Sequence, residues 1–298
     1  MVNHTAVIPP PVPTSSVGPV PTVIPGDTPV FQHIHDTGKR TLWVVVVLMG
    51  ISSLCFYVLA SRVQVQKRLF HILTSLITTI SFLAYLAMAT GDGIAWKYAC
   101  THESHRHVPD TKQEYLRQVF WARYVNWTLT NPLIIINLAL VAGMNGANLL
   151  VAISADLIMF VSGLIATFAR HERRWVWYTI TCTAYMTLIY QITVNGGRAS
   201  TNRTHQTQRF FTSFSGATLL VMVLYPIILA ASPLAHRITL DSETVVWAIL
   251  DILTQAVFGF WLLLTHDSRE AGTLYVDGFW SHGHGNEGAI RVGEHEGA

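Results

Sequence analysis

The sequence predicts an all-α integral membrane protein, a bundle of seven transmembrane helices. The composition is one reason: 51% of the 298 residues are hydrophobic and 12% are charged, against about 25% charged in an average soluble domain. The second reason is a repeated apolar run that begins at Thr41. Each run holds about 20 residues, which at about 1.5 Å rise per residue spans a hydrocarbon core of about 30 Å.

Seven such runs follow one another and form a predicted membrane domain over residues 41–266. Each is predicted as a helix because backbone amides in lipid must find their hydrogen-bond partners within the segment. The runs cover residues 41–61, 68–91, 117–142, 146–169, 174–195, 208–232 and 243–266. Most links are short, and the long second link, residues 92–116, is expected to be a solvated polar loop.

Two flanking segments are expected to lie outside the membrane domain. Residues 1–40 are predicted as a disordered arm, because eight of the twelve prolines fall within its first 38 positions and such a segment buries too little apolar surface to fold. Residues 267–298 are rich in Gly and are predicted as a flexible tail.

Several classes of function are excluded by charge and by Cys and His spacing. Nineteen Lys and Arg against seventeen Asp and Glu leave a formal charge of +2, too balanced for nucleic-acid binding. Three cysteines without paired spacing predict neither a disulfide framework nor a thiolate metal site. The stretch from His102 to His107 lacks the spacing of a helical zinc motif, so no metal site is expected.

Ionisable residues inside membrane spans are costly and are therefore functional candidates. Arg123 lies in the third run, Asp156 in the fourth and Asp251 in the seventh, with Glu243 at the entrance of the seventh. Opposite charges predict an ion pair between Arg123 and Asp251, and both a purely structural clamp and a working site stay open. Asp156 is expected to be protonated or hydrogen-bonded between helices, in a structural role.

The third run presents a polar face at helical spacing, formed by Arg123, Asn126, Thr130 and Asn137. Neutral amides on this face offer hydrogen bonds but accept no proton near neutral pH, so they provide no proton relay. Hydrogen bonding between helices is an equal alternative for the neighbouring Asn131.

This run resembles the third helix of the microbial rhodopsins. In that family the stretch carries an arginine, a carboxylate proton acceptor and a carboxylate proton donor; here the acceptor and donor positions hold Asn126 and Asn137. The matching residues are Arg123, Tyr124, Trp127, Thr130, Pro132 and Leu133.

The resemblance continues in other helices and implies the family's seven-helix fold, with an extracellular N-terminus and a cytoplasmic C-terminus. The family's retinal lysine aligns with Gln255, whose amide cannot form a Schiff base, so no covalent retinal is expected. All four lysines of the chain lie outside the runs. The candidate pocket comprises Tyr85, Arg123, Asn126, Trp127, Thr130, Asp156, Tyr178, Tyr225, Asp251 and Gln255.

The pattern is most similar to the fungal opsin-related proteins, which include heat-shock proteins of the plasma membrane. The resemblance implies a non-photoactive, non-enzymatic protein of the stress response, chaperone-like or regulatory. Its expected partners are the lipid bilayer and plasma-membrane proteins such as the proton ATPase, with no nucleic acid; its oligomeric state stays open. Two alternatives remain: a sensor that binds retinal or a sterol noncovalently, and passive conduction of ions or protons.

Overall fold

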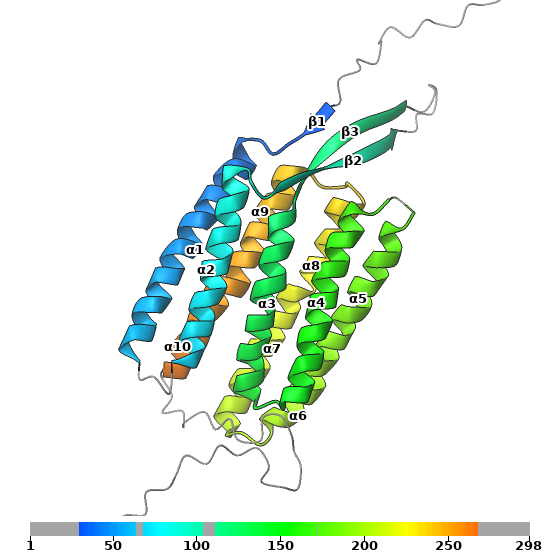
Figure 1. Ribbon diagram of the computed structural model, residues 1–298. Helices are drawn as coiled ribbons and strands as arrows, with labels where there is room; N and C mark the ends of the chain where they lie inside the picture. Colours follow the sequence, from blue (N-terminus) through cyan, green and yellow to red (C-terminus); the bar gives the residue numbers. More distant parts are fainter. Residues whose placement is uncertain (1–29, 64–67, 104–110, 171, 268–298) are drawn as a thin grey trace, which may run out of the picture.

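The computed structural model describes residues 30–63, 68–103, 111–170 and 172–267. These residues form a bundle of seven membrane-crossing helical segments, which confirms the predicted fold class (Figure 1). A small three-stranded sheet lies at the end of the bundle where the described chain begins, and we call this the N-terminal end.

Four segments are continuous helices and three contain a π-helical stretch. The continuous ones are α1 (Asp36–Arg62), α2 (Leu69–Thr90), α3 (Trp121–Ala142) and α4 (Gly146–Phe168). The fifth joins α5 (Arg174–Tyr190), η2 (Gln191–Gly196) and α6 (Gly197–Ser200). The sixth joins α7 (His205–Met222), α8 (Leu224–Leu229) and η3 (Ala230–Leu234), and the seventh joins α9 (Leu240–Asp251), η4 (Ile252–Val257) and α10 (Phe258–Asp267).

Within the described residues, six helices are long and apolar enough to cross a bilayer by length and composition alone. The remaining segment is the fifth, in which α5 has 17 residues and gains further length from η2 and α6. The chain is therefore a multi-pass membrane protein.

The described part of the second link consists largely of two strands, which corrects the expectation of a loop there. It forms β2 (Ile94–Glu103) and β3 (Thr111–Phe120), an antiparallel pair, so that α3 begins at Trp121 and not at residue 117. A third strand, β1 (Val30–Gln32), pairs in parallel with β3.

Residues 30–40 are ordered as well, in contrast to the predicted disordered arm. They form β1 and the start of α1, and the backbone N–H of Ile34 donates to Oε1 of Gln118 on β3 at 2.9 Å. The Asp241 carboxylate accepts further bonds from the N–H groups of His35 and Gly38, both at 3.0 Å. The rest of the arm, residues 1–29, and the tail from residue 268 lie outside the described residues.

Helix ends follow from local sequence signals. Gly91 and Gly143 end α2 and α3 with φ angles of 95° and 72°, a left-handed conformation that favours glycine at this position. Two residues after Gly143, the side chain of Asn145 caps α4 by accepting from the N–H of Asn148 at 2.9 Å. These caps keep the link between α3 and α4 short.

Helix α3 lies at the centre of the bundle, in contact with α2, α4 and α7. Its inward face carries large buried side chains together with polar ones, among them Trp127, Asn126 and Thr130. The seventh segment passes this face with its π-helical stretch η4, which begins directly after Asp251 and contains Gln255. π-helical turns of this kind occur frequently at functional sites.

The packing around α10 predicts that Gly259→Ala destabilises the bundle. A Cβ at Gly259 would lie 2.6 Å from Cγ2 of Thr74 on α2 and 3.2 Å from Cζ of Phe56 on α1. Helix α10 would have to shift, at a cost of about 1–3 kcal/mol, which thermal unfolding of the purified protein measures. Gly216→Ala is the matched control, since nothing lies within 4 Å of its Cβ position; equal melting temperatures for the two variants would contradict the prediction.

Candidate functional site

The centre of the bundle holds a buried carboxylate, Asp251, at the end of α9. It is fully buried and accepts three hydrogen bonds from three other helices. The Tyr85 hydroxyl donates to Oδ2 at 2.6 Å, the Trp127 indole donates to Oδ1 at 2.8 Å, and the Tyr225 hydroxyl donates to Oδ1 at 2.9 Å. Such a set of donors stabilises a carboxylate that would otherwise be costly to bury.

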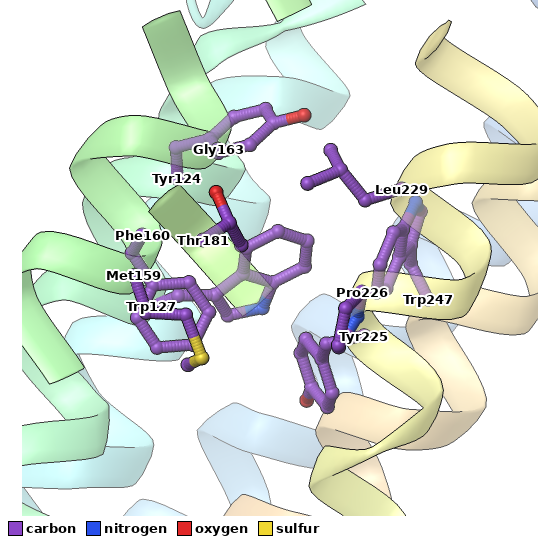
Figure 2. A pocket seen from close by; sticks show the side chains of 10 residues that line it. All are labelled: Tyr124, Trp127, Met159, Phe160, Gly163, Thr181, Tyr225, Pro226, Leu229 and Trp247. Atoms are coloured by element: carbon purple, nitrogen blue, oxygen red, sulfur yellow. The ribbon is translucent and has the colours of Figure 1, made fainter. Parts of the chain in front are cut away.

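Aromatic rings pack around this carboxylate and leave little free space. The ring of Trp127 lies 4.6 Å from Trp247, 5.1 Å from Tyr225 and 5.6 Å from Phe160, between centroids. Figure 2 shows these side chains converging from α3, α4, α8 and α9 on a small cavity. Its volume is about 20 Å³, enough for about one water molecule.

A row of neutral polar groups lies next to the carboxylate. Gln255 on η4 donates through Nε2 to Oγ1 of Thr130 on α3 at 3.3 Å, and Thr130 in turn donates to the Asn126 carbonyl at 2.8 Å. Asn126 donates through Nδ2 to Oγ of Ser81 on α2 at 3.4 Å. This row links three of the membrane segments without any formal charge.

The predicted ion pair between Arg123 and Asp251 is wrong. Arg123 pairs instead with Glu243, through Nη1 and Oε1 at 3.3 Å, while both oxygens of Asp251 accept from the three donors described above. Helical spacing placed Arg123 on the inward face correctly, but Arg123 lies in the first turn of α3. Its level in the bundle therefore matches Glu243 in the first turn of α9, two turns before Asp251.

A second arginine, Arg117 on β3, completes this ion-pair cluster and was not among the predicted site residues. It is buried and donates through Nη2 to Oε2 of Glu243 at 3.0 Å and to Oγ of Ser232 at 3.1 Å. It is the first residue of the predicted third run, residues 117–142. Because the hairpin was missed, nothing in the sequence pattern indicated that this side chain turns inward.

The other predicted pocket residues are more dispersed. Asp156 on α4 is fully buried, and neither of its oxygens has a hydrogen-bond partner among the described residues, so the expected bond between helices is not found. Asn137 is also buried, near the opposite end of α3. Tyr178 donates to the Pro226 carbonyl at 3.2 Å and, like Tyr85, does not line the central cavity.

Trp247 is the principal central residue that the sequence-based pocket omitted. It is 1% exposed and lines the cavity together with Trp127 and Leu229 (Figure 2). A usable signal was present, because Trp247 precedes Asp251 by four residues and therefore lies on the same face of the helix.

The anchoring of Asp251 predicts a graded loss of stability. Asp251→Ala leaves the buried donors of Tyr85 and Trp127 without an acceptor, while the Tyr225 hydroxyl keeps Thr254 as a partner. It should lower the free energy of unfolding by on the order of 3 kcal/mol. Tyr225→Phe removes one donor and should cost about 1 kcal/mol. Thermal unfolding provides the comparison, with Tyr190→Phe at a 53% exposed tyrosine as the control; a fully stable Asp251→Ala variant would refute the anchoring role.

Comparisons with known proteins agree with this fold. Residues 37–268 match the family described as bacteriorhodopsin-like protein. Opsin-1 of Neurospora crassa is 43% identical over 282 residues, which cover 94% of this chain and 92% of that protein.

Two solved structures, both light-driven proton pumps, have the same fold. The pump from Leptosphaeria maculans is 41% identical with a TM-score of 0.77, covering 80% of this chain and 98% of that one. The rhodopsin of Coccomyxa subellipsoidea is 27% identical with a TM-score of 0.73, covering 80% and 100%. The chain therefore belongs to the bacteriorhodopsin-like family of microbial rhodopsins.

Proposed function

We propose that this chain is a non-photoactive opsin-related protein that acts through protein partners. The residue that carries the proposal is Gln255, which the sequence resemblance aligns with the family's retinal lysine and which donates a hydrogen bond to Thr130 in the structure. An amide nitrogen is not nucleophilic enough to form a Schiff base with an aldehyde. A light-driven cycle that depends on that linkage cannot begin.

Members of this family normally bind retinal, and the residues of this chain do not fit a covalently attached one. Its four lysines are Lys39, Lys67, Lys97 and Lys112, none of which lies in α9, η4 or α10. The aromatic side chains leave a central cavity of about 20 Å³, whereas sites for small molecules have about 300–1,000 Å³. The same comparison disfavours noncovalent binding of retinal or a sterol in this central cavity, because several rings would have to move.

Proton transport lacks its titratable groups as well. The acceptor and donor positions of the family hold Asn126 and Asn137, and both are buried amides in α3. The passive-conduction alternative relied on a path through Arg123, Asp251 and Glu243. Arg123 pairs with Glu243, whereas Asp251 accepts from three other donors. The three side chains therefore belong to two separate clusters, which disfavours a single conduction path through them.

The first test is a retinal-binding experiment. The full-length protein, purified without chromophore, is mixed with all-trans retinal and washed, with a light-driven family member prepared in the same way as the positive control. We expect no visible absorption band after washing, because the chain offers no amine at the site. A band that survives washing and bleaches with hydroxylamine would contradict the proposal.

The cellular role that we propose is regulatory, in the stress response at the plasma membrane, with the N-terminus outside and the C-terminus in the cytoplasm. It rests on the resemblance to fungal opsin-related proteins and on the loss of photochemical groups, which leaves interaction with other membrane proteins as the remaining activity. The plasma-membrane proton ATPase is the proposed target.

This role predicts a change in ATPase activity. Proton pumping would be measured in vesicles that contain the purified ATPase with and without this chain, and with a light-driven family member of similar size as the control for crowding. We expect the pumping rate to change in the vesicles that contain this chain, and not in those that contain the light-driven family member. Identical rates in all three preparations would exclude the ATPase as the target and leave the retinal result unaffected.

A further inference from the structure

A second, separate cavity lies at the N-terminal end, beneath the sheet and away from the Asp251 core. It has a volume of about 10 Å³, close to that of one water-sized probe. Residues from β2, β3, α3, α9 and the segment before α9 line it, including Lys97, Arg117, Arg123, His236 and Glu243.

Positive charge exceeds negative charge in this lining. Lys97 and Arg117 are direct partners across the antiparallel strands β2 and β3, an arrangement in which like charges repel. Arg123 adds a third cation from α3, whereas Glu243 is the one carboxylate among the lining residues and is already shared by Arg117 and Arg123. With Lys97 protonated, the lining carries a formal excess of two positive charges.

Two hydrogen-bond donors of the Arg123 guanidinium group are unpaired at this cavity. Arg123 is 2% exposed, and its Nε and Nη2 atoms have no hydrogen-bond partner among the described residues. Its described contacts are Nη1 with Glu243 and the Phe120 ring, whose centroid lies 5.2 Å from the guanidinium carbon. Buried donors of a charged group are costly when they are unpaired, so an acceptor is expected.

The pKa of Lys97 reflects the same excess of positive charge. Burial, with the neighbouring Arg174 and Arg117, lowers the pKa of its ammonium group to about 8. The Lys97 ammonium donates to the backbone carbonyl of Thr167, which supplies a neutral acceptor but no counter-charge.

We propose that this cavity binds one small monovalent anion of the halide class, with chloride as the physiological form. A space of about 10 Å³ is too small for a phosphate or a carboxylate group, so a monatomic ion is the anion that comes nearest to fitting it. Because chloride is somewhat larger than a water molecule, the long side chains of Lys97 and Arg123 would move outward slightly to admit it. Bound there, it accepts from the free Arg123 donors and offsets the repulsion between Lys97 and Arg117. The ion would thereby link the sheet to the ends of α3 and α9. It would act as a structural ligand, and this role is independent of the proposed function through protein partners.

Thermal unfolding of the full-length protein in sodium chloride and in sodium gluconate at equal ionic strength tests this site. We expect the melting temperature to rise saturably with chloride and not with gluconate, because a ligand of the folded state stabilises it in proportion to its occupancy. Arg123→Gln should abolish the difference. Arg198→Gln, at an exposed arginine of α6 toward the opposite end of the bundle, should retain it.

A direct measurement keeps the proposal testable if Arg123→Gln does not fold. Crystals of the unaltered protein grown in sodium bromide should show an anomalous scattering peak in the cavity, near Arg123 and Lys97. The proposal is overturned by equal melting temperatures in chloride and gluconate. The proposal is also overturned if the bromide crystal shows no anomalous peak in the cavity while the Arg117–Glu243 pair is intact.

Discussion

The structure depends above all on the carboxylate of Asp251 and its three hydrogen-bond donors. The donors come from α2, α3 and α8, so a single side chain of α9 ties together four of the seven membrane segments. In a lipid-embedded core, an ionised carboxylate without such partners would cost several kcal/mol. The aromatic residues of the centre are therefore held by hydrogen bonds as well as by packing, and they close the space between the helices.

Under the proposed loss of the retinal lysine, this constraint explains why the core is still ordered. In the proposed alignment the lysine position holds a neutral amide, Gln255, and the acceptor position on α3 holds a second one, Asn126, so that one cation and one anion are missing together. The remaining charges, those of Arg123 and Asp251, do not balance each other as the sequence predicted. Arg123 is balanced by Glu243 near the N-terminal end, while Asp251 is stabilised by hydroxyl and indole dipoles and not by an arginine.

The sequence predicted the helices well because the demand of lipid for apolar length and internal hydrogen bonding is read directly from run length. It predicted Trp127 and Tyr225 as pocket residues through their match to the motifs of microbial rhodopsins. It failed where the answer depends on position along a neighbouring helix: the eight residues that separate Glu243 from Asp251 correspond to about 12 Å, which helical spacing in α3 alone does not resolve. The β2–β3 hairpin was missed because charged and polar residues interrupt its alternation, and with it the inward turn of Arg117 was missed.

We propose that this rhodopsin core has exchanged chromophore attachment for internal hydrogen bonding. Intact-protein mass spectrometry after incubation with retinal and borohydride reduction tests it most directly, because reduction converts any Schiff base into a stable secondary amine. The account predicts the unmodified mass of the 298-residue chain. A retinyl adduct on a lysine, formed in proportion to added retinal and absent after denaturation of the protein beforehand, would contradict it.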